Sequence, residues 1–260
     1  MASYISSMPV WATALFIAGF LYSIAFIANP AKQAALDAGM TPVSARNIQL
    51  GVFGFYILYL AYASLLALKG VFYVNTIPPK VMVLTAVPLA VILFVIVGNT
   101  KLFRQLLRSV TLESLIALHV FRLLGVFFLL LYFYHLLPLG FAFSAGMGDI
   151  ITAILALPVA KMVSKGKPGS LKIAFAWNIF GALDIINILV ITGISARNSI
   201  ATGKVGSMEM TMFPFVWFPA FAPATILFLH TVIFRKLHLG RINYRATDLS
   251  TGQSARRNPR

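Results

Sequence analysis

The chain of 260 residues has no cysteine and only six acidic residues. The lack of cysteine excludes disulfide bonds, thiolate metal sites, cysteine-bound iron–sulfur clusters and a cysteine nucleophile. Charged residues of either sign make up 10% of the chain, whereas 60% of it is hydrophobic and its mean hydropathy is +0.89. A water-soluble globule cannot hide that much apolar surface, because its outer shell must face water. The composition therefore indicates an integral membrane protein.

Long apolar runs occur seven times along the chain. A membrane-spanning helix needs about 20 predominantly apolar residues to cross roughly 30 Å of hydrocarbon. The runs of this kind cover residues 10–28, 48–68, 81–98, 115–137, 141–163, 171–194 and 213–234. They are continuous rather than alternating in polarity, which favours helices over β-strands. The sequence thus predicts an all-α, polytopic transmembrane helix bundle of about seven helices.

We expect residues 1–234 to form a single transmembrane domain. Asn29 and Pro30 follow the first run and are expected to end its helix. The tail, residues 235–260, is polar and basic. We expect its end, from residue 247, to be disordered, because it has few apolar residues to bury.

The 21 lysines and arginines give the chain a net charge of +15. In a soluble protein this would suggest a nucleic-acid partner, but here the basic residues lie between apolar runs, so no nucleic acid is expected. Sixteen of them fall in 29–47, 99–114, 161–172 and the tail, four fall in the other loops, and Arg122 lies inside a run. Lysine and arginine collect on the cytoplasmic side of membranes. We therefore expect the N-terminus outside, the tail in the cytoplasm, and contact with anionic lipid headgroups.

Polar and ionisable residues inside the apolar runs are the candidate functional groups. Such residues are costly in hydrocarbon, so they normally face the bundle interior and find partners there. The candidates are Glu113, His119, Arg122, Asp149, Trp177, Asn178, Asp184, Asn187 and His230. By depth, we expect Arg122, Asp149 and Asp184 to form a buried charge cluster. His119, Asn178 and His230 are expected to line its cytoplasmic side.

Short motifs suggest two further chemistries. Gly146 to Asp149 matches the GxGD pattern of intramembrane aspartyl proteases, but the second aspartate they need on the preceding helix is missing. His119 and His230 lie at similar depth on different runs, as two axial haem ligands must. A single haem b held by this pair is therefore one alternative, whereas the motifs predict no metal site.

The second half of the chain carries a distinctive combination of short runs. They are Arg122 to Gly125 (RLLG), Leu137-Pro138, Phe141 to Asp149 (FAFSAGMGD), Trp177 to Asp184 (WNIFGALD), and Pro219 and Pro223 followed by His230. Over roughly residues 119–235, this combination resembles a family of bacterial multi-pass membrane proteins whose activity is unassigned. The resemblance implies a location in the bacterial cytoplasmic (inner) membrane. It also implies that six side chains belong to one constellation: Arg122, Asp149, Trp177, Asn178, Asp184 and His230.

The leading functional hypothesis is binding or transport of a small molecule or ion through the buried cluster. Asp149 and Asp184 would bind a proton or cation, and Arg122 would neutralise one of them or hold an anionic group. His230 would relay protons toward the cytoplasm, and Trp177 would wall the pocket.

Two other hypotheses stay open. In the first, the chain is a membrane-embedded enzyme or a haem or quinone redox protein, with His119 and His230 as cofactor ligands. In the second, it is a structural accessory subunit, in a homo-oligomer or a larger membrane complex, and the cluster only holds helices together.

Overall fold

The computed structural model describes residues 4–203 and 206–256, with side chains described to His238. Within these residues, seven helices are long and apolar enough to cross a membrane, and the only β-pairing is a single bridge between Ile5 and Phe213. The seven apolar helices confirm the predicted all-α polytopic bundle and indicate a multi-pass membrane protein.

Four of the spans are single continuous α-helices. The third and fourth spans each consist of several short helical segments, and the seventh is part of a longer helix. The regular spans are α1 (Val10–Asp37), α2 (Pro42–Leu68), α7 (Leu139–Ser164) and α8 (Ser170–Thr202). The third span joins η1 (Met82–Ala86), α3 (Val87–Ala90), η2 (Val91–Ile96) and η3 (Val97–Asn99). The fourth joins α5 (Leu112–Ala117), η4 (Leu118–Gly125) and α6 (Val126–Phe133). The seventh is the first part of α9 (Trp217–Arg256).

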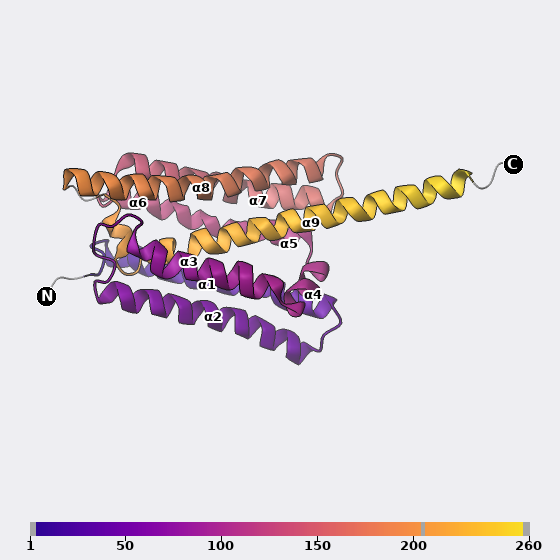
Figure 1. Ribbon diagram of the computed structural model, residues 1–260, viewed down its shortest axis with the longest axis horizontal. Helices are drawn as coiled ribbons and strands as arrows, with labels where there is room; N and C mark the ends of the chain where they lie inside the picture. Colours follow the sequence, from indigo (N-terminus) through magenta and orange to yellow (C-terminus); the bar gives the residue numbers. More distant parts are fainter. Residues whose placement is uncertain (1–3, 204–205, 257–260) are drawn as a thin grey trace.

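Two short helices lie outside the spans. The helix α4 (Lys101–Ser109) connects the third span to the fourth, and the 3₁₀-helix η5 (Met208–Thr211) lies between α8 and α9. Figure 1 shows α4 at the end of the bundle that also carries the α1–α2 and α7–α8 connections and the extension of α9. The N-terminus lies at the opposite end. The predicted alternation of the loops between two ends is therefore reproduced.

Several helix ends differ from the sequence prediction. The helix α1 continues through Pro30 to Asp37, because a proline in a spanning helix is tolerated where neighbouring groups satisfy the freed carbonyls. The helix α8 continues past residue 194 to Thr202, and hydropathy alone does not detect such a polar extension. The helix α9 begins only at Trp217, so Pro214 precedes it.

The C-terminal tail also differs from the prediction. Helix α9 continues to Arg256, whereas the sequence favours disorder from residue 247. No proline interrupts the tail before Pro259, and its leucine, arginine, alanine and glutamine residues are compatible with a helix. The last part of the predicted disordered segment, residues 257–260, lies outside the described residues.

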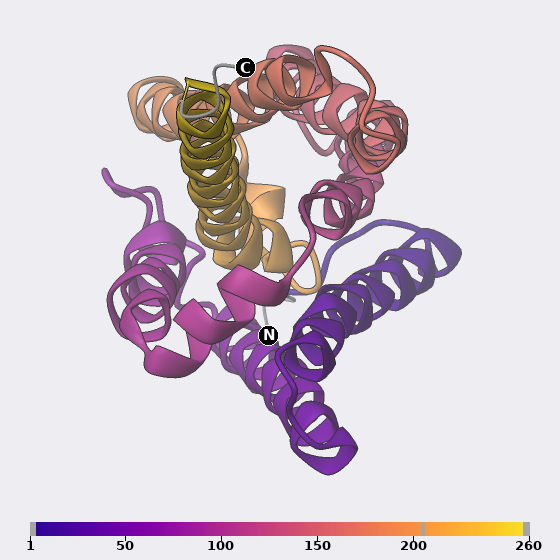
Figure 2. The ribbon, with the colours of Figure 1, turned by 90° about the vertical axis from the view of Figure 1, so that its right-hand side faces the viewer.

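The helix α9 is the central helix of the bundle. It packs against α2, α5, α8 and the third span, and most of its spanning part is buried. Figure 2, viewed from the end that carries α4, shows α9 between the α1–α2 pair and the α7–α8 pair. Toward the N-terminal end, the helices α1, α6 and α9 meet in an aromatic core. Phe16 contacts Phe127, Phe215 and Phe218 at ring-centroid distances of 5.2, 4.6 and 5.0 Å.

Candidate functional site

The fourth span places its polar side chains by an unusual local geometry. Its middle part, η4, is a 3₁₀-helix over the eight residues Leu118–Gly125. A 3₁₀-helix has three residues per turn, so residues three apart lie directly above one another. His119, Arg122 and Gly125 therefore share one face, and all three are buried. Runs this long are uncommon in 3₁₀ form and often mark functional or strained segments.

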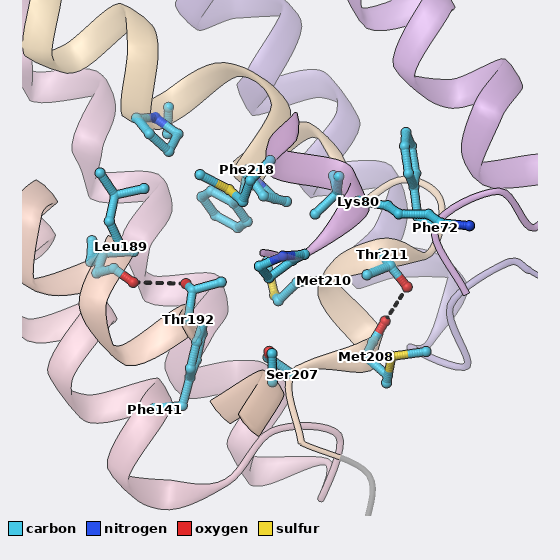
Figure 3. Close-up of a pocket in the computed structure, with 18 of the residues that line it drawn as sticks. Phe72, Lys80, Phe141, Leu189, Thr192, Ser207, Met208, Met210, Thr211 and Phe218 are labelled. Atoms are coloured by element: carbon cyan, nitrogen blue, oxygen red, sulfur yellow. Dashed lines mark hydrogen bonds between the residues drawn. The ribbon is translucent and has the colours of Figure 1, made fainter. Parts of the chain in front are cut away.

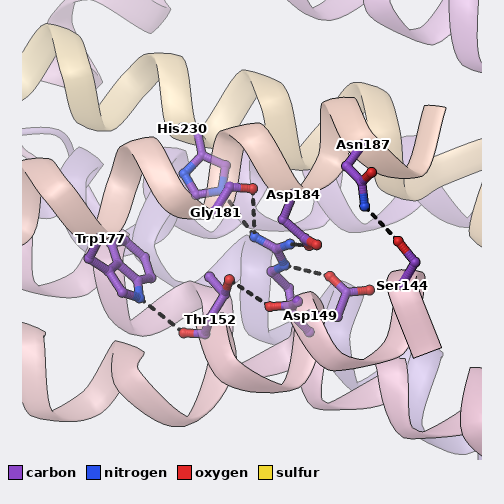
Figure 4. Close-up of polar contacts among 10 residues, drawn as sticks. Ser144, Asp149, Thr152, Trp177, Gly181, Asp184, Asn187 and His230 are labelled. Atoms are coloured by element: carbon purple, nitrogen blue, oxygen red, sulfur yellow. Dashed lines mark hydrogen bonds and ion pairs between the residues drawn. The ribbon is translucent and has the colours of Figure 1, made fainter. Parts of the chain in front are cut away.

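Arg122 is the centre of the buried cluster and is only 1% exposed. Its Nε donates to Asp149 Oδ1 on α7 at 2.6 Å, and its Nη2 donates to Asp184 Oδ2 on α8 at 2.5 Å. Its Nη1 donates to the Gly181 carbonyl and to His230 Nε2 on α9, both at 3.1 Å. Figure 4 shows Asp149, Gly181, Asp184 and His230 converging on this point. One guanidinium thus joins four of the seven spans.

The charges of the cluster do not balance. Arg122 carries one positive charge, and Asp149 and Asp184 together carry two negative charges when both are ionised. Each carboxylate gives one oxygen to Arg122, and no hydrogen bond to its other oxygen is found among the described residues. An uncompensated charge inside a membrane is costly. With both carboxylates ionised, the cluster therefore carries one negative charge in excess.

His230 has a defined protonation state in this geometry. Its Nε2 faces a guanidinium N–H, which can only donate, so Nε2 must accept. Its Nδ1 then carries the hydrogen and donates to Asn178 Oδ1 at 2.8 Å. The Asn178 amide in turn donates to the His230 backbone carbonyl at 3.0 Å, which fixes the orientation of the amide. His230 is thus neutral, and Asn178 of α8 fixes the orientation of its ring.

His119 lies beside His230 but makes no hydrogen bond. It is fully buried, and neither of its ring nitrogens has a partner in the described structure. Its ring lies 4.3 Å from that of His230 and makes an edge-on contact with Trp177 at 5.1 Å. A buried imidazole without a hydrogen-bond partner is rare, because burying a polar group unpaired is costly.

The two histidines do not fit haem ligation. Axial ligands must approach the iron from opposite faces of the porphyrin, with the macrocycle between them. Here the imidazoles stack 4.3 Å apart, and both nitrogens of His230 are already bonded to Arg122 and Asn178. The pair therefore leaves no space for a haem between the rings, and the arrangement gives no support to that alternative.

Three glycines allow the helices to approach the cluster. A Cβ built on Gly125 would lie 2.5 Å from the Cβ of Asp149, and one on Gly181 would lie 2.6 Å from Cε1 of His230. A Cβ on Gly148 would overlap the carboxylate of Asp184. Small residues at helix contacts have this role in membrane proteins. The absence of side chains at these three positions thus lets the helices approach the charged groups closely.

A cavity of about 60 Å³ is lined both by Asp149 of the cluster and by the α2–η1 connection, toward the end of the bundle that carries the N-terminus. Asp149 is the member of the cluster that lines it. The cavity walls come from the α2–η1 connection, α7, α8, η5 and α9; Figure 3 shows Phe72, Lys80, Thr192, Met210 and Phe218 around it. This volume holds a few water molecules, since one water needs roughly 10–15 Å³ measured in the same way.

Trp177 and Asn187 do not line this cavity. Trp177 donates from Nε1 to the Thr152 carbonyl at 3.1 Å and lies beside His119. Asn187 donates to Ser144 Oγ at 2.8 Å in an exposed pair, and Glu113 lies in the first turn of α5, also exposed. Of the polar candidates, Asn187 and Glu113 therefore lie outside the cluster.

The sequence reasoning missed Glu209 of η5. It is buried outside the spans and accepts a hydrogen bond from the Ser6 hydroxyl, which ties the N-terminal segment to this loop. Two backbone bonds, Ser6 N–H to the Phe213 carbonyl and Phe213 N–H to the Tyr4 carbonyl, close the same contact. Burial raises the pKa of the Glu209 carboxyl, and hydrogen bonds from Ser6 and Ser7 oppose the rise. One feature of the sequence could have pointed to Glu209: it is one of only six acidic residues in the chain.

No group of three or more histidine, cysteine, aspartate or glutamate side chains is placed to hold a metal ion in the described part of the chain. The family profile described as a domain of unknown function, DUF8737, matches residues 78–238, which contain every residue of the Arg122 cluster. No curated protein and no solved structure matches the chain.

Proposed function

Because the chain belongs to the DUF8737 family, whose function is unknown, we propose a function from the geometry of the buried cluster. The protein binds a proton or small cation between Asp149 and Asp184 and couples this step to binding or movement of a small molecule across the membrane. The membrane is the cytoplasmic membrane of a bacterium, with the N-terminus outside and the basic tail inside.

The proposal rests on the position of Asp149, which belongs to the cluster and also lines the cavity. One oxygen of Asp149 binds Arg122 in the cluster, and the same side chain lines the cavity that leads to the N-terminal end. A purely structural ion pair needs no such access. A proton or ion that enters the cavity meets Asp149, one of the two carboxylates that bind Arg122.

The two histidines extend the proposed proton path from the carboxylates toward the tail-bearing end of the bundle. His230 accepts from Arg122 through Nε2 and holds its hydrogen on Nδ1, so it can exchange protons only when this network rearranges. His119, with both nitrogens free of protein partners, lies next to it. A proton that arrives at the carboxylates can leave toward the tail-bearing end by way of this histidine pair.

The test uses the purified protein in liposomes loaded with a pH-sensitive dye, with an imposed pH gradient or Na⁺ gradient. Asp149→Asn preserves the shape of the side chain and its acceptor for Arg122, but it removes the charge. We expect this variant and Asp184→Asn to slow proton or Na⁺ flux by about tenfold or more, equivalent to at least about 1.4 kcal/mol. Asn187→Ala, which alters a polar pair outside the cluster, serves as the control and should retain the flux of the unaltered protein.

Flux that is unchanged in a folded Asp149→Asn variant would rule out the proposal. Folding is checked independently by the melting temperature of each variant in detergent. A proton and a cation are distinguished by repeating the assay with Na⁺ on both sides of the membrane.

The second candidate is a structural role, in which the cluster locks the helices of an accessory subunit. The enclosure of Arg122 favours it, because one side chain bridges η4, α7, α8 and α9 with no solvent exposure. Such a lock predicts that Arg122→Gln lowers stability by about 3–5 kcal/mol. It also predicts no flux in the unaltered protein, and this outcome separates the two candidates.

A further inference from the structure

A second cavity lies between the helices, away from the charge cluster, and has a volume of about 620 Å³. It is bounded by α1, α2, the third span, α4, α5 and α9, and its walls include Ile27, Phe55, Ile92, Phe103 and Phe228. This size is within the range of roughly 300–1,000 Å³ that ligand pockets have. The cavity shares no residue with the Arg122 cluster, so its role is independent of the proposed function.

The cavity is lined almost entirely by hydrocarbon. Its polar lining residues are Asn47, Tyr56 and Thr100. The Tyr56 hydroxyl accepts a hydrogen bond from Thr225, and the Thr100 hydroxyl accepts one from the Phe103 backbone. Apolar cavities do not hold water stably, and an empty one loses the van der Waals contacts of its walls. The expected occupant is therefore a hydrocarbon chain.

Helix α4 forms the wall of the cavity at the end of the bundle that carries the tail. Its apolar residues line the cavity, and its basic residues are exposed. The lining residues are Leu102, Phe103, Leu106 and Leu107, and the exposed basic residues are Lys101, Arg104 and Arg108. A helix with these two faces lies in the interface between hydrocarbon and headgroups. Arg46, exposed and next in sequence to the lining residue Asn47, adds a further positive charge.

Both ends of α4 are fixed. At its start, the Thr100 hydroxyl caps the helix by accepting from the Phe103 N–H at 3.0 Å. At its end, Lys236 of α9 donates to the carbonyls of Leu107 and Arg108 at 3.2 and 2.7 Å. A cation at this position also suits the negative end of the helix dipole. The basic residues are thus held beside the cavity and do not belong to a loose loop.

We propose that this cavity binds an acyl chain of an anionic phospholipid from the bilayer, whose phosphate contacts Lys101, Arg104 and Arg108. The apolar walls select hydrocarbon, and the basic helix selects a negatively charged headgroup. A neutral lipid would satisfy only the first requirement. The protein therefore carries a defined lipid site at the end of the bundle that bears the tail.

The test is native mass spectrometry of the full chain in detergent, with phosphatidylglycerol and phosphatidylcholine added at equal concentration. Gly51 lines the cavity, and a Cβ on it meets no atom within 4 Å, so Gly51→Leu fills the cavity without a clash at Cβ. Gly54 lies on the same helix, meets no atom either, and does not line the cavity, so Gly54→Leu is the matched control. We expect the unaltered protein and Gly54→Leu to retain phosphatidylglycerol and Gly51→Leu to lose it.

A second variant replaces Lys101, Arg104 and Arg108 by glutamine and tests the headgroup even if Gly51→Leu does not fold. Its control replaces three other exposed lysines by glutamine: Lys165 and Lys167 of the α7–α8 connection and Lys172 in the first turn of α8. We expect the first variant to lose about tenfold in its preference for phosphatidylglycerol over phosphatidylcholine, and the control to keep it. Equal retention of the two lipids by the unaltered protein would overturn the proposal. Retention of phosphatidylglycerol by a folded Gly51→Leu protein would also overturn it. The same holds if the lipid that co-purifies in the cavity is a neutral isoprenoid.

Discussion

Arg122 is a buried charged residue whose side chain contacts three neighbouring helices. Its charge is buried in a helix that crosses an apolar environment, where an isolated arginine would be strongly disfavoured. Two carboxylates, a carbonyl and an imidazole nitrogen replace the lost water around it. With both carboxylates ionised, the same arrangement leaves one negative charge in excess, which is the basis of the proposed proton or cation site.

Glu209 permits a prediction on pH. Burial raises its pKa above the ordinary value of 4.5, so the folded state favours the protonated form. Its stabilising contribution is therefore complete below pH 4.5 and is lost as the pH rises through the folded-state pKa. We expect the unaltered protein to lose stability over this range and Glu209→Gln to lose less. Thermal unfolding in detergent at a series of pH values measures the difference.

Ser6→Ala is the control for this contact. It removes the hydroxyl that donates to Glu209 and is expected to lower stability by about 1 kcal/mol. It leaves the carboxyl in place, so the pH dependence should persist. Identical pH profiles for Glu209→Gln and the unaltered protein would show that Glu209 does not titrate over this range.

At the scale of helices, the close contact between α7 and α8 depends on Gly148. A Cβ at this position would overlap the carboxylate of Asp184 and push it away from Arg122. We expect Gly148→Ala to lower stability by about 2–4 kcal/mol, from overpacking together with a disturbed buried ion pair. Gly140→Ala on the same helix meets no atom within 4 Å, so it should change stability by about 1 kcal/mol or less. Melting temperatures of the two variants in the same detergent test this, and equal values would contradict the tight contact.

The sequence predicted the number of spans because hydrocarbon crossing imposes a length and a composition on each helix. It also predicted which polar residues converge, since Arg122, Asp149 and Asp184 have few other ways to be buried. It could not predict the helix ends, because the last turns of α8 are polar and α1 passes through Pro30.

The sequence also could not show that the two histidines have different hydrogen-bond partners. His119 and His230 have the same residue type and similar depth, but only His230 meets an amide on α8 and the guanidinium on η4. That distinction depends on the 3₁₀ geometry of η4, and no local propensity signals it. The cavities were likewise beyond prediction, because their walls come from residues far apart in the sequence.

At the scale of the whole molecule, the two cavities lie toward opposite ends. The smaller cavity is lined by Asp149 and by the α2–η1 connection toward the N-terminal end, and the larger cavity is lined by α4 near the end that bears the tail. The charge asymmetry of the loops predicts how this arrangement is oriented in the membrane. If the basic end is cytoplasmic, ions enter the cluster from outside, and the lipid site lies in the inner leaflet, where anionic lipids attract basic segments.

The orientation can be tested directly because the chain contains no cysteine. Single substitutions Lys69→Cys, at the end of α2, and Lys165→Cys, at the end of α7, place one thiol at each exposed end of the bundle. In intact bacterial cells, a membrane-impermeant maleimide should label Lys69→Cys, whereas Lys165→Cys should react only after the membrane is permeabilised. The unaltered protein should take up no label in either condition. Labelling of Lys165→Cys alone in intact cells would invert the orientation, and the cavity that reaches Asp149 would then open to the cytoplasm.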